Sequence, residues 1–189
     1  MTKIAVQSGV KAAKDIHPGD MVWTHDNGYQ PVRWVGHSTV KALGAFAPVV
    51  IAPGAIGNDD ELVVSQQHRI LIQDAAAELL FGVNEVLIAV KHLCGLPGIG
   101  QRPGGSVTYV HLMCDQHQII CSKGIESESF FQSNLSISGV EADQKRELLA
   151  LFPSLKAGME SFSETATPIL KGFEATAFCN YLQADRVAH

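Results

Sequence analysis

Apolar and polar residues alternate along most of the first 130 positions, and turn residues recur at the spacing typical of short strands. This pattern predicts a mainly β body. The best single hairpin joins residues 21–24 to residues 31–35, because Asn27-Gly28 lies between them and Asn-Gly is favoured where both turn residues need positive φ. Further strands are predicted at residues 49–52, 62–64, 69–72, 78–81, 85–90, 107–113 and 118–122.

Glycine and proline interrupt this pattern most strongly between Gly95 and Gly105. The stretch is predicted to be an exposed loop. The alternation ends after about Asn134, where Ser138 and Glu141 have capping-box spacing. They predict a helix over residues 142–152.

A second helix is predicted near the end of the chain. Thr167-Pro168 offers a cap followed by proline at the first helical position, and Phe173, Ala177 and Tyr181 then recur at intervals of four residues. The chain therefore divides into a β domain of residues 1–133 and a C-terminal helical appendage of residues 134–189.

Composition fits one compact core, since 46% of the 189 residues are hydrophobic and 17% are charged. The net charge of -5 is mild, and the basic residues are scattered, so neither a nucleic acid nor a membrane surface is an expected partner. The first residues lack the apolar core of a signal peptide, and no run is apolar enough to span a bilayer. Four irregularly spaced cysteines do not fix the redox compartment, so the localisation stays open.

Two polar clusters carry the candidate chemistry. Ser65-Gln66-Gln67-His68 lies inside the apolar run of residues 62–72, and residues 108–120 hold further acid, base and thiol groups. A hydroxyl three residues before a histidine is suited to binding a peptide bond and distorting it from planarity. Without further signals, the simpler interpretation of His68 is a structural histidine at a strand end whose ring nitrogens are hydrogen-bonded.

The second cluster also permits a metal site, because His111, Cys114, His117 and Cys121 have the short spacing of a transition-metal ligand set. Strand geometry opposes it. In an extended segment, His111 and His117 share one face while Cys114 points to the other, so the ligands converge only around a β-bulge. We therefore predict no metal and no cofactor, with Cys114 and Cys121 packed in the core.

Several motifs in order along the chain resemble the Hedgehog/intein (Hint) family, in its bacterial branch. They are Asp15 to Val22, Gln30 to Gly36, Val64 to Leu71 and Tyr109 to Phe130, and the tail segments 148–153 and 168–175 are similar as well. The resemblance covers most of residues 2–133. It implies a pseudo-two-fold β horseshoe with C-terminal helices that cleaves or rearranges the peptide bond at its own N-terminus, so that the partner is its own upstream polypeptide.

The resemblance also implies roles for particular residues. A first cysteine attacks the preceding carbonyl, and a Thr/Ser-x-x-His motif, here Ser65 and His68, polarises the bond and protonates the leaving nitrogen. His117 is similar to the histidine that assists the second step, while Asp115 and His111 fall where acid-base partners are found. Such help is needed because amide resonance resists attack, and general acid catalysis contributes roughly 10²–10⁴ in rate.

The chain departs from the family at its start, which reads Met1-Thr2-Lys3-Ile4-Ala5 where the family has Cys-Phe-x-x-Gly-Thr. Thr2 matches the last residue of that motif, so the chain as printed lacks the motif's cysteine. We expect it to be inactive because that cysteine is the nucleophile. The ending lacks the His-Asn pair of an intein, which favours N-terminal cleavage over splicing. The alternative is a non-catalytic binding or structural module on a Hint scaffold.

Overall fold

The structure is a computed structural model that describes residues 2–122, 124–129, 146, 150 and 167–188. Its strands are β1 (Lys3–Val6), β2 (Gly9–Ala12), β3 (Met21–Thr24), β4 (Gly28–Pro31), β5 (Trp34–Lys41), β6 (Val49–Ile51), β7 (Leu62–Val64), β8 (Arg69–Gln73), β9 (Glu85–Ala89), β10 (Ile99–Gln101), β11 (Ser106–Met113), β12 (Ile119–Ser122) and β13 (Ile125–Glu128). The helices are α1 (Ala75–Phe81) and α3 (Gly172–Ala188), with 3-10 turns η1 (Ala13–Asp15), η2 (Gly44–Phe46) and η3 (Val90–Leu93). The mainly β prediction is confirmed.

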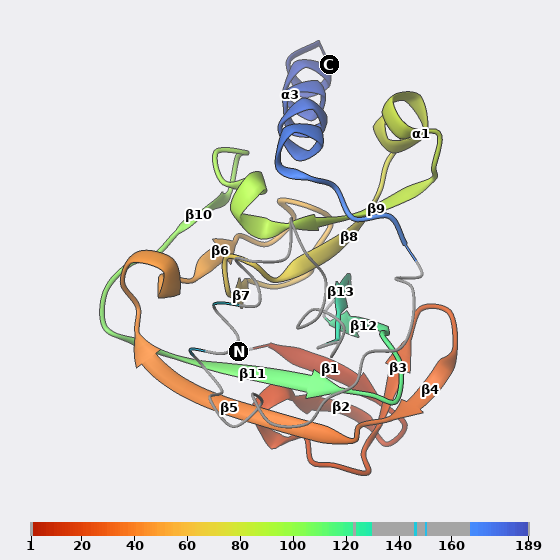
Figure 1. The fold of residues 1–189 in the computed structure, drawn as a ribbon, viewed down its shortest axis with the longest axis vertical. Coiled ribbons are helices and arrows are strands. Elements are labelled where there is room, and N and C mark those ends of the chain that lie inside the picture. The colour runs from red at the N-terminus through yellow and green to blue at the C-terminus, as the bar shows by residue number, and fades with distance from the viewer. Residues whose placement is uncertain (1, 123, 130–145, 147–149, 151–166, 189) are drawn as a thin grey trace.

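The strands form three antiparallel groups. The largest sheet has the order β2-β1-β3-β12-β13-β8-β9, with β4 paired to β3. A second sheet has the order β10-β6-β7, and β5 and β11 form a long two-stranded ribbon. In Figure 1 this ribbon runs below the N-terminus, and β7 lies above it.

The predicted first hairpin exists, with a different register. Thr24 pairs with Gly28 and Met21 with Pro31, so the second strand begins earlier than predicted. The loop contains His25, Asp26 and Asn27, and Gly28 takes φ 61°. A three-residue loop followed by a left-handed glycine is a common hairpin connection, and it replaces the expected two-residue turn.

The strand predicted over residues 78–81 is wrong, because these residues belong to α1. Asp74 caps this helix by accepting a hydrogen bond from the backbone N–H of Ala76 at 2.8 Å. At the other end Gly82 has φ 70° and its N–H bonds to the carbonyl of Glu78, which closes the helix. Three consecutive alanines between these caps favour the helix further.

The loop prediction for residues 95–105 is wrong in part. Ile99–Gln101 form β10, which pairs with β6, and the Ile99 side chain is buried. The partner strand lies about fifty residues earlier in the chain, so the local pattern of glycine and proline did not reveal the pairing.

The C-terminal helix is present but begins differently from the prediction. Pro168 and Leu170 instead follow β9: the carbonyl of Pro168 accepts from Leu87 N–H at 2.8 Å, and Leu170 N–H donates to the Leu87 carbonyl at 2.9 Å. The helix starts at Gly172. The helix predicted over residues 142–152 lies outside the described residues.

The buried face of α3 is not the one that carries Phe173 and Tyr181. Phe173 is 74% exposed and Tyr181 38% exposed, whereas Phe178 is fully buried and Ala175 lies beside it in the core. Phe178 contacts Phe81 of α1, with ring centroids 6.2 Å apart. The helix therefore packs through a face rotated away from Phe173 and Tyr181.

Two main hydrophobic cores hold the described β body, together with a smaller cluster of Leu71, Leu87 and Ile119. One is formed by side chains of β6, β7, β8 and β9 together with α1, η3 and α3, and it includes Leu62, Ile88 and Phe178. The other joins β1, β3, β11 and β12, and includes Ile4 and Leu112. The candidate site lies between them, since residues of both cores line it.

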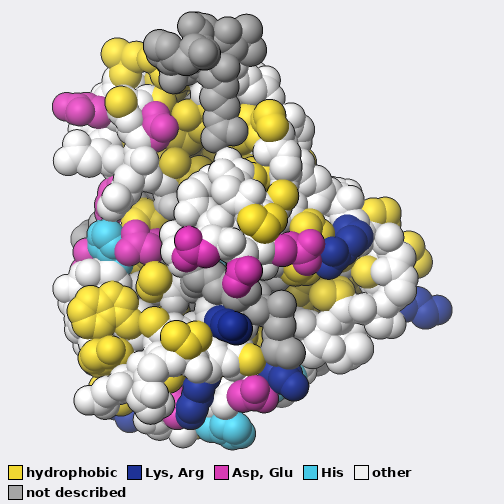
Figure 2. All heavy atoms as spheres, turned by 180° about the vertical axis from the view of Figure 1, so that it is seen from behind, with side chains coloured by type: hydrophobic (Ala, Val, Ile, Leu, Met, Phe, Trp, Pro, Cys, Tyr) yellow, Lys and Arg dark blue, Asp and Glu magenta, His cyan; other side chains and the backbone are white. Residues whose placement is uncertain are grey.

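No helix in the described residues combines the length and apolar character that a membrane span requires. On the face seen in Figure 2, the Lys and Arg side chains lie apart from one another, with Asp and Glu side chains among them. That face carries no single basic patch.

The packing of α3 predicts unequal effects of two phenylalanine substitutions on the same helix. Phe178→Ala should lower the free energy of unfolding by about 3–5 kcal/mol, because it removes a fully buried ring from the core. Phe173→Ala should change it by less than about 0.5 kcal/mol. Urea unfolding followed by circular dichroism measures both, and equal losses would contradict this placement of the helix.

Candidate active site

The Ser65–His68 motif forms a tight turn between β7 and β8. His68 N–H donates to the Ser65 carbonyl at 3.2 Å, and the His68 carbonyl accepts from Val90 N–H at 3.0 Å. The Gln66 side chain donates to the carbonyls of Gly44 and Ala47 at 2.8 and 3.0 Å. These bonds fix the direction in which the His68 ring leaves the turn.

The turn opens into a pocket of about 360 Å³. Ser65 and His68 line it from one side, and His111 on β11 lines it together with Tyr109. Thr2, just before β1, also lines the pocket. The structure therefore brings together the N-terminal segment and three of the five predicted site residues.

Burial sets the protonation of the two pocket histidines. It lowers the pKa of His68 below its ordinary value of 6.5, an effect that the charge of Arg69 reinforces and the charge of Glu128 opposes. Burial and the charge of His68 lower the pKa of His111 to about 4, again against the opposing charge of Glu128. His111 is therefore neutral near pH 7, and the neutral form of His68 is favoured.

A buried ionic cluster lies beside these rings. Glu128, at the end of β13, accepts from the backbone N–H of Arg69 at 3.1 Å and from its guanidinium at 3.2 Å. His117 Nε2 lies 3.6 Å from Glu128 Oε2. Burial acts to raise the pKa of Glu128, but Arg69 and His117 outweigh it and hold that pKa at about 2. His117 thus reaches the site through Glu128, which itself lines the pocket.

Asp115 is placed elsewhere. It is exposed and forms a bidentate pair with Arg33, with Nε–Oδ1 and Nη2–Oδ2 distances of 2.9 and 2.8 Å. This pair lowers the pKa of the Asp115 carboxyl. Asp115 is not among the described residues that line the pocket. The cause is the end of β11 at Met113, after which the chain bends before β12.

The argument against zinc assumed that residues 111–117 form one extended strand. The bend shows that they do not, because His111 lies on β11 and His117 lies beyond its end. The cysteines of the proposed ligand set are separated by packing: Cys114 belongs to the core around β1 and β3, and Cys121 lies on β12. Among the described residues, no group of three or more His, Cys, Asp or Glu side chains is arranged to hold a metal ion.

Sequence reasoning missed Arg69 and Glu128. The available signal was a charged residue next to apolar ones in each of two strands. A charged side chain is rarely buried unless it is paired, so two such residues could have been considered as partners. The pairing partners are 59 residues apart, so local patterns could not join them.

Residues 1–134 match the family model described as the Hint domain. The chain belongs to the Hint family. Membership of this family indicates a domain of the autoprocessing type. Its homologues act in cis on their own flanking polypeptide. The resemblance inferred from the motifs of residues 2–133 is therefore confirmed at the level of the family.

Solved inteins are similar to this Hint domain at low identity. A crystal structure of the MchDnaB-1 intein is 12% identical, with 68% of this chain and 96% of that chain covered at a TM-score of 0.44. A crystal structure of the gp41-1 intein is 14% identical, with 67% and 92% covered at a TM-score of 0.39. No curated protein matches the chain.

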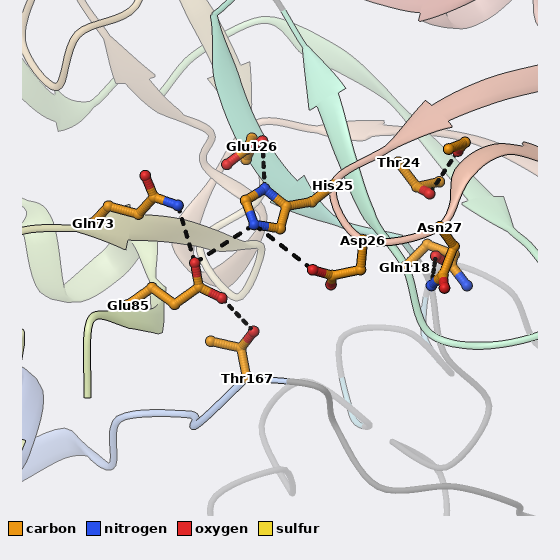
Figure 3. Close-up of polar contacts among 10 residues, drawn as sticks. Thr24, His25, Asp26, Asn27, Gln73, Glu85, Gln118, Glu126 and Thr167 are labelled. Carbon is orange, nitrogen blue, oxygen red and sulfur yellow. Dashed lines mark hydrogen bonds and ion pairs between the residues drawn. The ribbon is translucent and has the colours of Figure 1, made fainter. Parts of the chain in front are cut away.

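A cluster of one histidine and three carboxylates lies outside the pocket of the Hint domain. Figure 3 shows the His25 ring between three carboxylates, with Nδ1 2.7 Å from Glu126 and Nε2 3.6 Å from Glu85 and 3.7 Å from Asp26. Hydrogen bonding to Glu126 raises the pKa of His25 against the effect of burial, and the other two carboxylates add to the rise. The His25 ring therefore links the first hairpin to β9 and β13.

Glu85 extends this cluster to the C-terminal segment. Its carboxylate accepts from Gln73 Nε2 at 3.0 Å and from Thr167 Oγ1 at 3.2 Å. The side chain thus connects β8, β9 and the segment that precedes α3, as Figure 3 shows.

The raised pKa of His25 predicts a pH-dependent contribution to stability. The contribution is complete below the unfolded-state pKa of about 6.5 and is lost as the pH rises through the higher folded-state pKa. Urea unfolding from pH 6 to 9 should show that His25→Gln destabilises the domain more at pH 6 than at pH 9. His37→Gln, at an exposed position of β5, is the matched control. A His25→Gln effect independent of pH would contradict the prediction.

Proposed function

We propose that this Hint domain cleaves the peptide bond at its own N-terminal junction through an amide-to-thioester shift. The observation that carries the proposal is the pocket shared by Thr2, Ser65, His68 and His111. Thr2 matches the last residue of the family's Cys-Phe-x-x-Gly-Thr motif, and the proposal requires an attacking cysteine at the first position of that motif. The substrate is then the polypeptide joined to that cysteine.

The chemistry requires one thiol proton to move from sulfur to nitrogen. Neutral His68 accepts the proton as the cysteine sulfur attacks the preceding carbonyl carbon. The carbon–nitrogen bond then breaks, and protonated His68 donates the proton to the departing nitrogen, which becomes the free amine of the cysteine. A thioester replaces the amide, and water or a thiol subsequently displaces the cysteine sulfur.

The other pocket residues support this transfer. Ser65 offers a hydroxyl at the turn that holds His68, in a position to orient the scissile carbonyl. His111 is neutral near pH 7, so it accepts hydrogen bonds without opposing the transient charge on His68. His117 assists the release of the thioester through its contact with Glu128. Asp115 remains outside this scheme because its carboxylate is held by Arg33 at the surface.

Restoring the upstream motif tests the proposal directly. A soluble passenger joined through Cys-Phe-x-x-Gly to Thr2 should be released when a small thiol or hydroxylamine is added, because both attack thioesters and leave ordinary amides intact. Mass spectrometry of the released passenger identifies the bond that was cut. Replacing the added cysteine with alanine is the control. A folded, uncleaved fusion would favour the non-catalytic binding module instead.

Variants of the restored fusion separate the roles of the site residues. His68→Ala should slow cleavage by roughly 10²–10⁴, the usual contribution of a general acid or base. His117→Ala should weaken cleavage less. The matched controls Asp115→Asn and Cys121→Ala should leave the rate nearly unchanged, since neither residue lines the pocket. Quantified cleavage time courses give these rates, and an Asp115→Asn loss as large as that of His68→Ala would contradict the assignment.

A further inference from the structure

Arg69 and Glu128 form a buried ion pair at the wall of the pocket. Both side chains are only 3% exposed, and they are joined by a guanidinium contact of 3.2 Å. The backbone N–H of Arg69 adds a second bond to the same carboxylate. Two points of attachment fix the position of Glu128 more firmly than a single side-chain contact would.

Folding alone gives little reason for this pair. Removing two charges from water offsets much of their attraction, and apolar side chains of similar size often serve a core as well. The neighbouring positions in β8 are apolar, with Ile70 and Leu71 buried. The pair therefore has a role beyond filling space.

The surroundings of the carboxylate indicate that role. Its Oε2, which also accepts from the Arg69 guanidinium, lies 3.6 Å from His117 Nε2, and the carboxylate lines the same pocket as His68 and His111. Its negative charge favours protonation of both pocket histidines, against the effect of burial. Arg69, by contrast, disfavours protonation of His68.

We propose that Glu128, clamped by Arg69, is a positioning residue for this pocket that fixes the His117 ring and stabilises the transient positive charge of His68. The proposal rests on the function proposed above. It gives a role to Glu128, which lies within the family-like segment of residues 109–130 but to which the resemblance assigned no role. In the proton transfer described above, His68 is cationic only between accepting the thiol proton and releasing it, so a fixed anion nearby lowers the energy of that stage.

The first test does not depend on cleavage. Nuclear magnetic resonance titration of the histidine rings in the chain as printed should give a lower midpoint for His68 in Glu128→Gln than in the wild type. Glu126→Gln is the matched control, because Glu126 lies two residues away on β13 and contacts His25 instead. It should lower the His25 midpoint and leave the His68 midpoint unchanged. An unchanged His68 midpoint in folded Glu128→Gln would overturn the proposal.

A second variant keeps the test decisive if Glu128→Gln does not fold. Arg69→Met/Glu128→Gln removes both charges at once, so no unpaired charge remains buried. Because Arg69 and Glu128 act on His68 in opposite directions, the His68 midpoint in this double variant should lie above that of Glu128→Gln, where that variant folds. It should also lie below that of Arg69→Met, which retains the carboxylate. A midpoint in the double variant equal to that in Arg69→Met would overturn the proposal.

The restored fusion supplies the functional readout. Glu128→Gln should slow thiol-induced cleavage by roughly tenfold to a hundredfold through misplacement of the rings, and its optimum should move to lower pH along with the His68 midpoint. Glu126→Gln should leave both unchanged. If the wild-type fusion does not cleave, the proposed function fails while the titration still decides the placement of Glu128. If it cleaves and Glu128→Gln matches its rate and pH optimum, this inference fails alone.

Discussion

The turn of residues 65–68 is the constraint on which the site depends, because it joins β7 of one sheet to β8 of another. β7 and β8 belong to different sheets but contribute side chains to the same hydrophobic core, which holds both ends of the turn. Hydrogen bonds from Val90 and Lys91 to the His68 and Gln66 carbonyls hold it against η3. His68 is thereby directed into the gap between the two cores rather than into either of them.

Much of the β body followed from the sequence, since β6, β7, β8, β9, β11 and β12 lie where alternation predicted strands. The errors occurred where a local signal competed with a distant one. Residues 79–81 form a short apolar run that was predicted as part of a strand, but the Asp74 cap and the alanines after it favour a helix. Phe173 and Tyr181 have helical spacing, yet the attachment of Pro168 and Leu170 to β9 sets the rotation of α3 and leaves both rings exposed.

The site was predictable only in part, for a related reason. Ser65 and His68 form a contiguous motif, and His111 follows from a resemblance that orders the motifs along the chain. Arg69 and Glu128 belong to strands β8 and β13, and only their pairing through Ile70 and Ser127 makes them neighbours. Asp115 was included on the resemblance alone, and the structure places its carboxylate at the surface beside Arg33, after β11 ends at Met113.

The electrostatics of the pocket follow from these positions. An apolar pocket wall favours neutral imidazoles, which suits acceptance of a proton but opposes the cation that forms next. Glu128 offsets this opposition, and it remains an anion in the interior because Arg69 supplies both a guanidinium and a backbone N–H. His68 is the last residue of the turn, and Arg69, the first residue of β8, follows it directly and binds the Glu128 carboxylate of β13 through its backbone N–H. The position of the counter-charge relative to the base therefore depends on this junction of the turn with β8 and on the pairing of β8 with β13.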